Sequence, residues 1–334
     1  MVFPTLSLIA RPLRIAQRAA SDASRLLGWL LMVGVLATGW AGSAAAQPSG
    51  GSWVDMPSQE ASGQAITLRG MLWTPAVPPK GAVVVLHGGG GWSDFREGHY
   101  GRALSAAGFA VLAVDSFGSR RIGPGLDHYR VAFEQMARDG FAARRLLIER
   151  GFPAERIALM GSSKGGAGAL YAADRHFLPQ QQDRFPVALA LYPVCHVRAR
   201  SPQPVSRLWI GLGEKDDLTG TTQCEEIADA YGRAGGRVSV KTYRDAVHGF
   251  DGDPANTVLF YASQLESFTR CVVYVEADGQ ESFEGKTYPA NGEAIMQAMR
   301  KSCVRKGASF WTNVRQKQAL TQDIIEFLTA SLGT

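Results

Sequence analysis

Short apolar runs alternate with helix-like segments over most of this 334-residue chain. Runs such as 82–86 and 157–160 are unbroken, which is typical of strands buried on both faces of a sheet. Since strands and helices alternate, the pattern predicts a mainly parallel sheet with helices on both faces. The predicted strands are 66–73, 82–86, 109–114, 157–160, 187–192, 208–212 and 238–243, and the predicted helices are 98–107, 129–150, a small-residue segment that ends near residue 175, and 222–234.

The two flanks of this core carry different patterns. Residues 47–63 are rich in Gly, Ser, Pro and Gln and predict a flexible leader into a domain over 64–334. After the last predicted strand, residues 271–288 indicate a hairpin that turns at Asp278-Gly279, followed by a helix over 292–305. We interpret 271–313 as a small insertion. An amphipathic helix over 316–332 is expected to pack on the sheet.

The first 46 residues have the order of a secretory signal peptide. Four arginines precede an apolar run from Leu26 to Trp40, and the small-residue stretch Ala44-Ala45-Ala46-Gln47 follows. The run has 15 residues, short of the roughly 20 that span a bilayer. We therefore expect cleavage after Ala46, an exported protein in the periplasm or medium, and no stable membrane insertion of the mature chain.

Composition narrows the class of partner. Hydrophobic residues make up 46% of the chain and charged residues 19%, as in a globular protein with a sizeable core. Removing 1–46 takes away four Arg and one Asp and lowers the net charge from +5 to +2. No basic stripe with interleaved aromatic residues is present, so no nucleic-acid partner is expected.

Four cysteines lie beyond the leader, at 195, 224, 271 and 303. None has the C-x-x-C spacing of a zinc or redox site. An even number in an oxidising compartment indicates two disulfides, with three pairings open. We favour 195–224 and 271–303 because each closes a local loop, and four buried free thiols are the alternative.

The main chemical signal is Gly161-Ser162-Ser163-Lys164-Gly165, a G-x-S-x-G pattern. The pentapeptide is weak by itself in a glycine-rich chain, so its context must decide. It directly follows a predicted buried strand and opens a helix of small residues, which is the setting of a nucleophile elbow. We predict Ser163 as a nucleophile, whose alternative is a glycine-rich tight turn.

A serine hydroxyl needs a base and an acid behind that base. His248 follows the last predicted strand and comes after the nucleophile in the chain, as this order requires. Asp216 follows strand 208–212 at its carboxyl end and is preferred to its neighbour Asp217. The remaining histidines, which precede the nucleophile or lie in helical or loop surroundings, are 87, 99, 128, 176 and 196.

A glycine loop supplies candidates for an oxyanion hole. The run HGGGGW at 87–92 follows an early strand, and its amides lack side chains that would block a substrate. With the backbone N–H of the residue after the nucleophile, Lys164, we predict Gly89 as the second donor. A phosphate-binding loop is excluded because neither G-x-G-x-x-G in the right context nor G-K-[ST] occurs.

Five stretches together resemble the dienelactone hydrolase family of the α/β-hydrolases: HGGGGW, VDSFGSR at 114–120, GSSKGG, LGEKDD and the H-x-F at His248. The resemblance covers about 73–264 and implies an α/β-hydrolase fold and ester or lactone hydrolysis. It also implies that Arg120 can face a substrate carboxylate, and a pairing of Arg120 with a structural acid is the alternative. Two features depart from the family: its namesakes use a cysteine where this chain has Ser163, and they lack the leader and the cysteine-bearing insertion.

The pattern as a whole predicts an exported serine hydrolase that cleaves a small carboxylic ester or lactone through an acyl-enzyme. We expect no metal and no cofactor. A serine peptidase and a catalytically silent hydrolase fold that only binds are the alternatives. The pentapeptide, its preceding strand and the order of Ser163, Asp216 and His248 favour the esterase.

Overall fold

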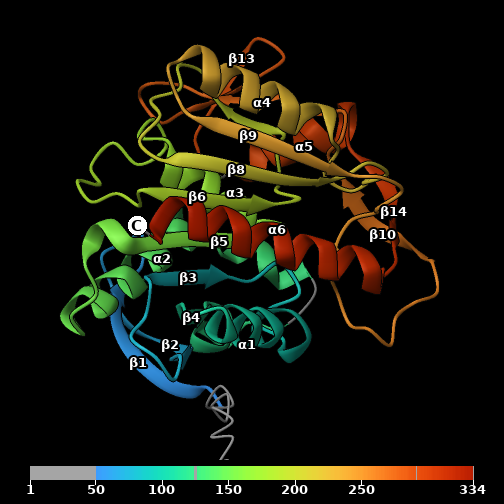
Figure 1. Ribbon diagram of the computed structural model, residues 1–334. Helices are drawn as coiled ribbons and strands as arrows, with labels where there is room; N and C mark the ends of the chain where they lie inside the picture. Colours follow the sequence, from blue (N-terminus) through green and yellow to red (C-terminus); the bar gives the residue numbers. More distant parts are fainter. Residues whose placement is uncertain (1–49, 124–125, 291, 334) are drawn as a thin grey trace, which may run out of the picture. The chain divides into compact units, whose positions relative to one another are not determined.

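A sheet of eight strands runs through the part of the chain that the computed structural model describes, residues 50–123, 126–290 and 292–333. These residues belong to one compact unit, Ala46–Thr334. The strand order is β1-β2-β4-β3-β5-β6-β8-β9 (Figure 1). The predicted signal peptide, 1–46, lies outside the described residues.

Six neighbouring strands of the sheet are parallel, and two strands at one edge are antiparallel. The parallel part confirms the predicted α/β sheet, and every connection between its strands contains a helix except the one from β6 to β8. β1 and β2 instead form an antiparallel pair, and β2 is also antiparallel to β4. The bounds are β1 Ser52–Gln59, β2 Ala65–Trp73, β3 Ala82–Leu86, β4 Ala110–Asp115, β5 Ile157–Ser162, β6 Val187–Leu191, β8 Arg207–Gly213 and β9 Val238–Tyr243.

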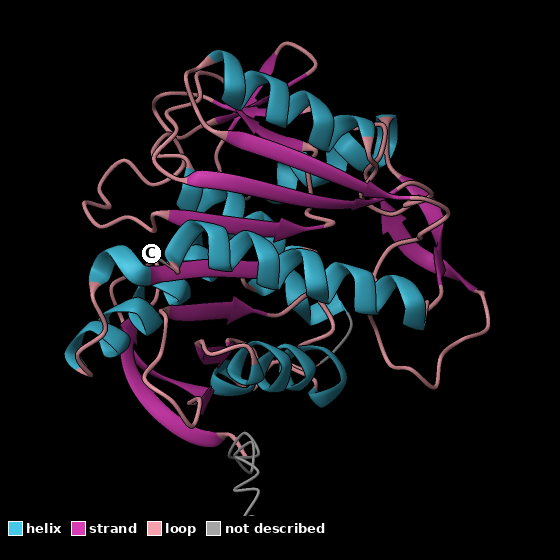
Figure 2. Ribbon diagram, in the orientation of Figure 1, coloured by secondary structure: helices cyan, strands magenta, loops and turns pink. Residues whose placement is uncertain are grey.

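Helices cover both faces of this sheet, as predicted. The buried strands explain why: successive side chains point to opposite faces, so Val84 and Leu86 of β3 enter one core and Val83 and Val85 the other. α2 (Phe133–Glu149), α3 (Lys164–Ala173) and α4 (Thr222–Arg233) pack on the first core. α1 (His99–Ala106) and α6 (Val314–Leu332) pack on the second. Figure 2 shows α1 and α6 crossing in front of the strands.

The region 47–63 was predicted as a flexible leader, and for residues 52–59 that prediction is wrong. These residues form β1, which pairs along its whole length with β2. Met56 is fully buried against the sheet. The strand escaped prediction because its polar residues mask the alternation and Pro57 disfavours a central strand, although an edge strand tolerates proline.

The C-terminal insertion is larger than predicted. β10 (Phe260–Ser267) pairs with β14 (Arg305–Phe310), so the added structure begins before residue 271. We call the β10–β14 pair the ribbon. The predicted hairpin is present as β11 (Val273–Val275) and β12 (Glu281–Phe283), followed by β13 (Lys286–Tyr288) and α5 (Glu293–Ser302). β7 (Val197–Ala199) joins β11 in parallel, a long-range pairing that no local pattern signals.

Short helical turns complete the described elements. The predicted helix 129–150 begins only at Phe133, because a separate 3-10 turn, Leu126–Arg130, precedes it. Among the helices of the described ranges, none combines the length and apolar character that a membrane crossing needs. The remaining turns are a π-helical segment, Asp94–Gly98, and the 3-10 turns Gly118–Arg120 and Ala154–Arg156.

Two disulfides tie the insertion and its surroundings together. Cys195 is bonded to Cys224, and Cys271 to Cys303, which confirms the favoured pairing. The Cys195–Cys224 bond joins the segment after β6 to the first turn of α4. The Cys271–Cys303 bond joins the segment before β11 to the end of α5. Gln223, next to Cys224, donates to the carbonyl of Cys271 and so connects the two bridges.

We expect the double substitution Cys271→Ser/Cys303→Ser to lower the free energy of unfolding. The bonded cysteines are 32 residues apart, and closing a loop of that length stabilises by about 3–4 kcal/mol in the chain-entropy model. Urea unfolding of the variant and the wild-type protein measures the difference. Thiol titration of the denatured, unreduced wild-type protein should find no free thiol, and two or more free thiols would contradict the pairing.

Candidate active site

The loop at Ser163 is a strained turn between a buried strand and a helix. β5 ends at Ser162 and α3 begins at Lys164, which leaves Ser163 at φ 52° and ψ −112°. A positive φ at a residue other than glycine costs on the order of 1–3 kcal/mol and persists only where the surroundings enforce it. Here the Ser163 N–H donates to the carbonyl of Leu191 at 2.8 Å, and its own carbonyl accepts from Ala167.

Two glycines allow the backbones around this turn to approach closely. A Cβ on Gly161 would lie 2.1 Å from the carbonyl oxygen of Gly165. A Cβ on Gly165 would lie 2.3 Å from the carbonyl oxygen of Leu86 at the end of β3. Both glycines of the G-x-S-x-G pattern are therefore required by contact between main chains.

Ser163, His248 and Asp216 lie in one hydrogen-bonded series. Nε2 of His248 is 2.9 Å from Oγ of Ser163, and Nδ1 of His248 is 2.8 Å from Oδ2 of Asp216. His248 and Asp216 are buried, with 4% and 8% of their surface exposed. The structure thus brings together the three side chains that the sequence proposed for a triad, from three loops at the carboxyl ends of β5, β8 and β9.

Asp216 is held as a carboxylate by its surroundings. Its burial would raise the pKa, but the charge and hydrogen bond of His248 and the hydrogen bonds from Thr219 outweigh burial, so the pKa lies below its usual value. Oδ1 accepts from the backbone N–H groups of Leu218 and Thr219, and Oδ2 accepts from the Thr219 hydroxyl. Thr219 was not singled out from the sequence, where a lone threonine carries no signal.

The neighbouring Asp217 points to a different partner. Its Oδ1 accepts from the backbone N–H of Ser309 and its Oδ2 from the Ser309 hydroxyl, both at 2.8 Å. Its carbonyl accepts from the hydroxyl of Ser267. Asp216 therefore faces His248, while Asp217 attaches the ribbon to the same loop.

The glycine loop lies over Ser163. A Cβ on Gly88 would be 3.4 Å from the Cβ of Ser163, and one on Gly89 would meet the ring of His128 at 3.6 Å. His87 fixes the start of the loop: its Nδ1 is 2.8 Å from the carbonyl of Gly88, and its Nε2 accepts from the N–H of Ser116. Burial lowers the pKa of His87, so the ring is a neutral support.

The side chain of Lys164, the residue after Ser163, is buried beside Phe133. The residue is 5% exposed, and its Nζ lies 4.9 Å from the ring centroid of Phe133. Burial lowers the pKa of Lys164 to about 8, and the charge of Glu134 acts in the opposite direction. Because Lys164 is the first residue of α3, its backbone N–H belongs to the helix terminus that faces Ser163.

Arg120 is engaged by acids of the protein itself. Its guanidinium makes a two-pronged contact with Asp139, at 2.7 and 2.9 Å, and its Nε donates to Glu60. Nη1 also donates to the carbonyl of Ser116, and the side chain is 8% exposed. Of the two roles left open for Arg120, the structure shows the pairing with structural acids, so we do not retain it as a substrate ligand.

A buried polar cluster behind His248 escaped the sequence analysis. Asp251, fully buried, accepts hydrogen bonds from the hydroxyls of Tyr100 and Tyr192, each at 2.6 Å, and from Nε of Arg96 at 3.0 Å. The Tyr192 ring stands edge-on to the ring of His248, 5.0 Å between centroids. Through Tyr192, which bonds to Asp251 and packs against His248, the cluster supports the loop that carries His248. Its one signal in the sequence is an aspartate three residues after the histidine.

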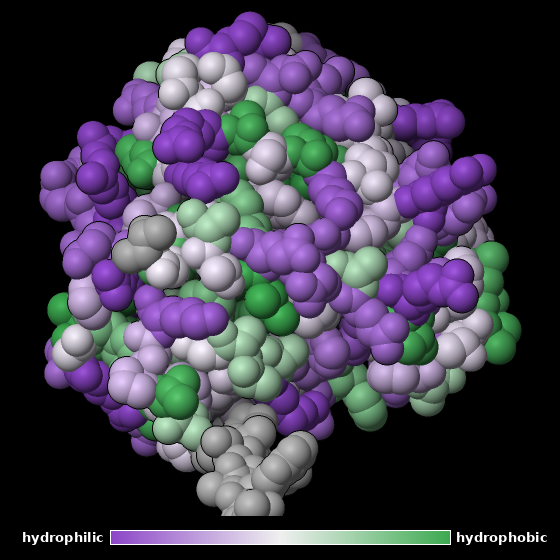
Figure 3. All heavy atoms as spheres, viewed as in Figure 1, coloured by the Kyte–Doolittle hydropathy of each residue, from purple (hydrophilic) through white to green (hydrophobic). Residues whose placement is uncertain are grey.

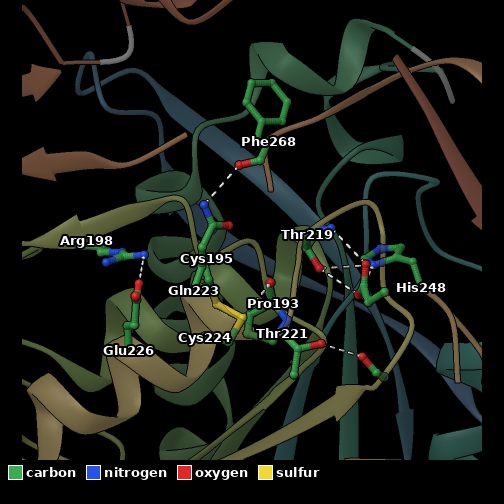
Figure 4. The surroundings of a disulfide bond; sticks show 12 residues. Pro193, Cys195, Arg198, Thr219, Thr221, Gln223, Cys224, Glu226, His248 and Phe268 are labelled. Carbon is green, nitrogen blue, oxygen red and sulfur yellow. Dashed lines mark hydrogen bonds and ion pairs between the residues drawn. A yellow bond between two sulfur atoms is a disulfide. The ribbon is translucent and has the colours of Figure 1, made fainter. Parts of the chain in front are cut away.

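The disulfide Cys195–Cys224 lies close to the acid loop. Figure 4 shows Thr219 and His248 on one side of the bridge and the ion pair of Arg198 with Glu226 on the other. The Thr221 hydroxyl donates to the carbonyl of Gly213, which fastens the loop between β8 and α4. Within the described part of the chain, no group of three or more His, Cys, Asp or Glu side chains is arranged to hold a metal ion.

The substitution Gly165→Ala should destabilise the fold strongly. Its methyl group would lie 2.3 Å from a backbone oxygen that cannot move aside, and we expect a loss of about 3 kcal/mol or more. Gly232→Ala in α4 is the matched control, because its Cβ would meet nothing closer than 3.7 Å and alanine stabilises a helix by up to about 1 kcal/mol. Urea midpoints measure both, and equal effects would contradict the close approach.

Asp251→Asn should destabilise the protein by about 3–5 kcal/mol, because it removes the charge of a fully buried carboxylate that pairs with Arg96, whose side chain is 22% exposed. Burial would raise the pKa of Asp251, but Arg96 and the tyrosine hydroxyls lower it below its ordinary value of 3.8. The carboxylate's contribution is therefore complete above pH 3.8 and lost as the pH falls through the lower folded value.

Urea unfolding at a series of pH values tests this contribution. The wild-type protein should lose stability over that acid range, and the variant should lose less of it. The control Asp229→Asn, on the exposed face of α4, should change stability by no more than about 0.5 kcal/mol. Similar unfolding of the two variants would contradict the role of the cluster.

Comparison with known proteins agrees with this architecture. A family model described as serine aminopeptidase, S33, matches residues 77–211, less than half of the chain. A dienelactone hydrolase-like promiscuous phosphotriesterase from metagenomic libraries superposes with a TM-score of 0.54 at 14% identity, over 85% of this chain and 100% of that chain. This likeness supports the fold.

Two further solved structures are similar over a shorter part. A Klebsiella pneumoniae protein assigned as a dienelactone hydrolase is 18% identical, with a TM-score of 0.46 over 60% of this chain and 88% of that chain. Esterase 2 of Thermogutta terrifontis is 19% identical, with a TM-score of 0.45 over 61% of this chain and 85% of that chain. No curated protein sequence matches the chain. The strand order, the helices on both faces and the likeness to the metagenomic dienelactone hydrolase-like structure together show that the chain has the α/β-hydrolase fold.

Proposed function

We propose that the protein is a serine hydrolase that cleaves carboxylic esters or lactones through an acyl-enzyme. The observation that carries the proposal is the unbroken hydrogen-bonded series from Asp216 through His248 to Ser163. A base within 2.9 Å of the hydroxyl, itself oriented by a buried carboxylate, is the arrangement that activates a serine.

In the first half-reaction, Oγ of Ser163 attacks the carbonyl carbon of the substrate while Nε2 of His248 takes the hydroxyl proton. Asp216 keeps the proton of Nδ1 in place and stabilises the imidazolium that forms. The tetrahedral intermediate then collapses, the C–O bond to the alcohol breaks, and His248 returns its proton to the leaving alkoxide. Ser163 is left acylated.

Backbone donors stabilise the negative charge that develops on the carbonyl oxygen. The N–H of Lys164, at the start of α3, and an N–H of the glycine loop, for which we propose Gly89, supply two such donors. Two observations support these donors: α3 begins directly after Ser163, and a Cβ added to Gly88 of the glycine loop would be in van der Waals contact with the Ser163 side chain. In the second half-reaction, His248 takes a proton from a water molecule whose oxygen attacks the acyl carbon. The bond from that carbon to Oγ of Ser163 then breaks, the acid leaves, and His248 returns the proton to Oγ.

Esters and lactones are the proposed substrates for reasons of fold and resemblance. The similar structure with a TM-score above 0.5 is described as dienelactone hydrolase-like and as a promiscuous phosphotriesterase. The family model is described as a serine aminopeptidase, which makes amide cleavage the second candidate. The two disulfides support folding in an oxidising compartment, and with the leader sequence they support export.

The two adjacent aspartates provide a matched test of the mechanism. Asp216→Asn should lower kcat on a dissolved ester such as p-nitrophenyl acetate by roughly 10⁴-fold, because the histidine loses its orienting carboxylate. Asp217→Asn changes a neighbouring acid that faces Ser309 instead, so its kcat should stay within about ten-fold of wild type. Steady-state kinetics on both variants checks the assignment.

Labelling and a substrate panel test the nucleophile and the reaction class. A fluorophosphonate should label Ser163 in the wild-type protein and nothing in Ser163→Ala, and the variant should lose turnover of esters and lactones. Labelling at another residue, or intact activity in Ser163→Ala, would overturn the proposal. Cleavage of aminoacyl amides without ester cleavage would favour the peptidase, and folded protein that takes no label would favour a silent binding protein.

A further inference from the structure

Four consecutive apolar side chains stand in solvent beside the ribbon. Val258, Leu259, Phe260 and Tyr261 are 77, 59, 51 and 62% exposed, and we call them the apolar ribbon end. Figure 3 shows hydrophobic side chains at the right-hand edge of the molecule, over the loop that enters β10 in Figure 1. Single exposed apolar residues are ordinary, but a contiguous group marks a surface that contacts something else.

This surface is continuous with the candidate active site. Phe260 is opposite Phe310 in the ribbon, and the two rings stack with centroids 5.4 Å apart. Phe310 in turn forms a backbone bridge with His248 and lies edge-on to its ring at 5.9 Å. One aromatic pair therefore connects the exposed apolar side chains to the proposed catalytic base.

The ribbon is held in this place by the acid loop. Asp217 binds the N–H and hydroxyl of Ser309, and its carbonyl accepts from Ser267 at the other strand. These contacts attach both strands of the ribbon to the residue that follows Asp216. An apolar side chain on the ribbon consequently keeps a fixed position relative to the triad.

Charge is separated from apolar surface along the ribbon. The end remote from His248 carries Arg305 and Lys306, both exposed, and Glu266, which pairs with Arg300. At the end next to His248 the strand residues, 260–262 and 308–310, carry no charge of their own, and the carboxylate of Asp217 lies there, bound by Ser309 opposite Tyr261. The apolar side chains of the ribbon are thus those next to His248, and its own charged side chains lie toward the other end.

We propose that the apolar ribbon end docks the enzyme onto droplets of a water-insoluble, uncharged ester and so directs acyl chains toward Ser163. The inference rests on the proposed function and specifies its substrate as an ester presented in an aggregated phase. Docking removes the apolar side chains of Val258 and Leu259 from water, and this burial stabilises the bound state. The ribbon then holds the droplet surface beside His248.

The first experiment measures docking without turnover. Ser163→Ala protein is mixed with a tributyrin emulsion, and the fraction that floats with the droplets is determined. The same measurement is made after adding Val258→Ser and Leu259→Ser, with Val77→Ser as the matched control because Val77 is 60% exposed in the loop between β2 and β3. We expect the double change to reduce droplet binding about ten-fold and the control to leave it unchanged. Equal binding by all three proteins would overturn the inference.

The second experiment measures activity with Ser163 intact. Val258→Ser/Leu259→Ser should hydrolyse emulsified tributyrin about ten-fold more slowly while dissolved p-nitrophenyl acetate is turned over at the wild-type rate. Equal losses on both substrates would overturn docking. Absence of ester hydrolysis in wild type, with droplet binding still dependent on Val258 and Leu259, would refute the proposed function separately from the surface.

A second copy of the chain is the competing occupant, because β10 has no strand partner on its outer edge within the described residues. Sedimentation velocity distinguishes the two. A monomeric wild type that floats with droplets agrees with docking. A dimer that Val258→Ser/Leu259→Ser converts to monomer, without droplet binding by wild type, would assign the surface to self-association and overturn the inference.

Discussion

The structure depends on the close approach of three backbones at the turn of Ser163. The turn places a serine at φ 52° between β5 and α3, and it can do so only because Gly161 and Gly165 have no side chains where main-chain oxygens lie about 2 Å from a Cβ position. The hydrogen bond from Ser163 to Leu191 couples the turn to the next strand. The strain at one residue is therefore balanced by packing across β3, β5 and β6.

The loops around this turn contain buried carboxylates whose charges and hydrogen-bonding needs are met by neighbouring side chains. Asp216 is satisfied by His248 and Thr219, and Asp251 by Arg96 and two tyrosines. A buried carboxylate without partners would be costly, so each acid is stable only when its loop is closed. The positions of the loops after β8 and β9 are consequently linked to the charges that they enclose.

The C-terminal insertion adds a second level of organisation to the α/β-hydrolase core. Its disulfide, the strand pairing of β7 with β11 and the contacts of Asp217 attach it to the edge of the sheet that carries the site. In this arrangement the ribbon becomes a wall next to His248. The insertion thus extends the site with apolar surface and leaves the strand order of the core unchanged.

The amino-acid sequence by itself predicted the α/β core and the turn at Ser163 from local periodicity and a short motif. Chain order pointed to His248 and favoured Asp216 over Asp217, and the short loops favoured one of three disulfide pairings. The edge strand β1, the ribbon and the β7–β11 pairing required the tertiary structure, since their strands are short, polar or far apart in the chain. Only the folded chain decided that Asp216 faces His248 while Asp217 faces Ser309, that Arg120 is bound by Asp139 and Glu60, and that Asp251 lies beneath the site. In each case the partner of a polar side chain depends on which residues from distant parts of the chain lie next to it. Such contacts produce no periodic pattern in the sequence.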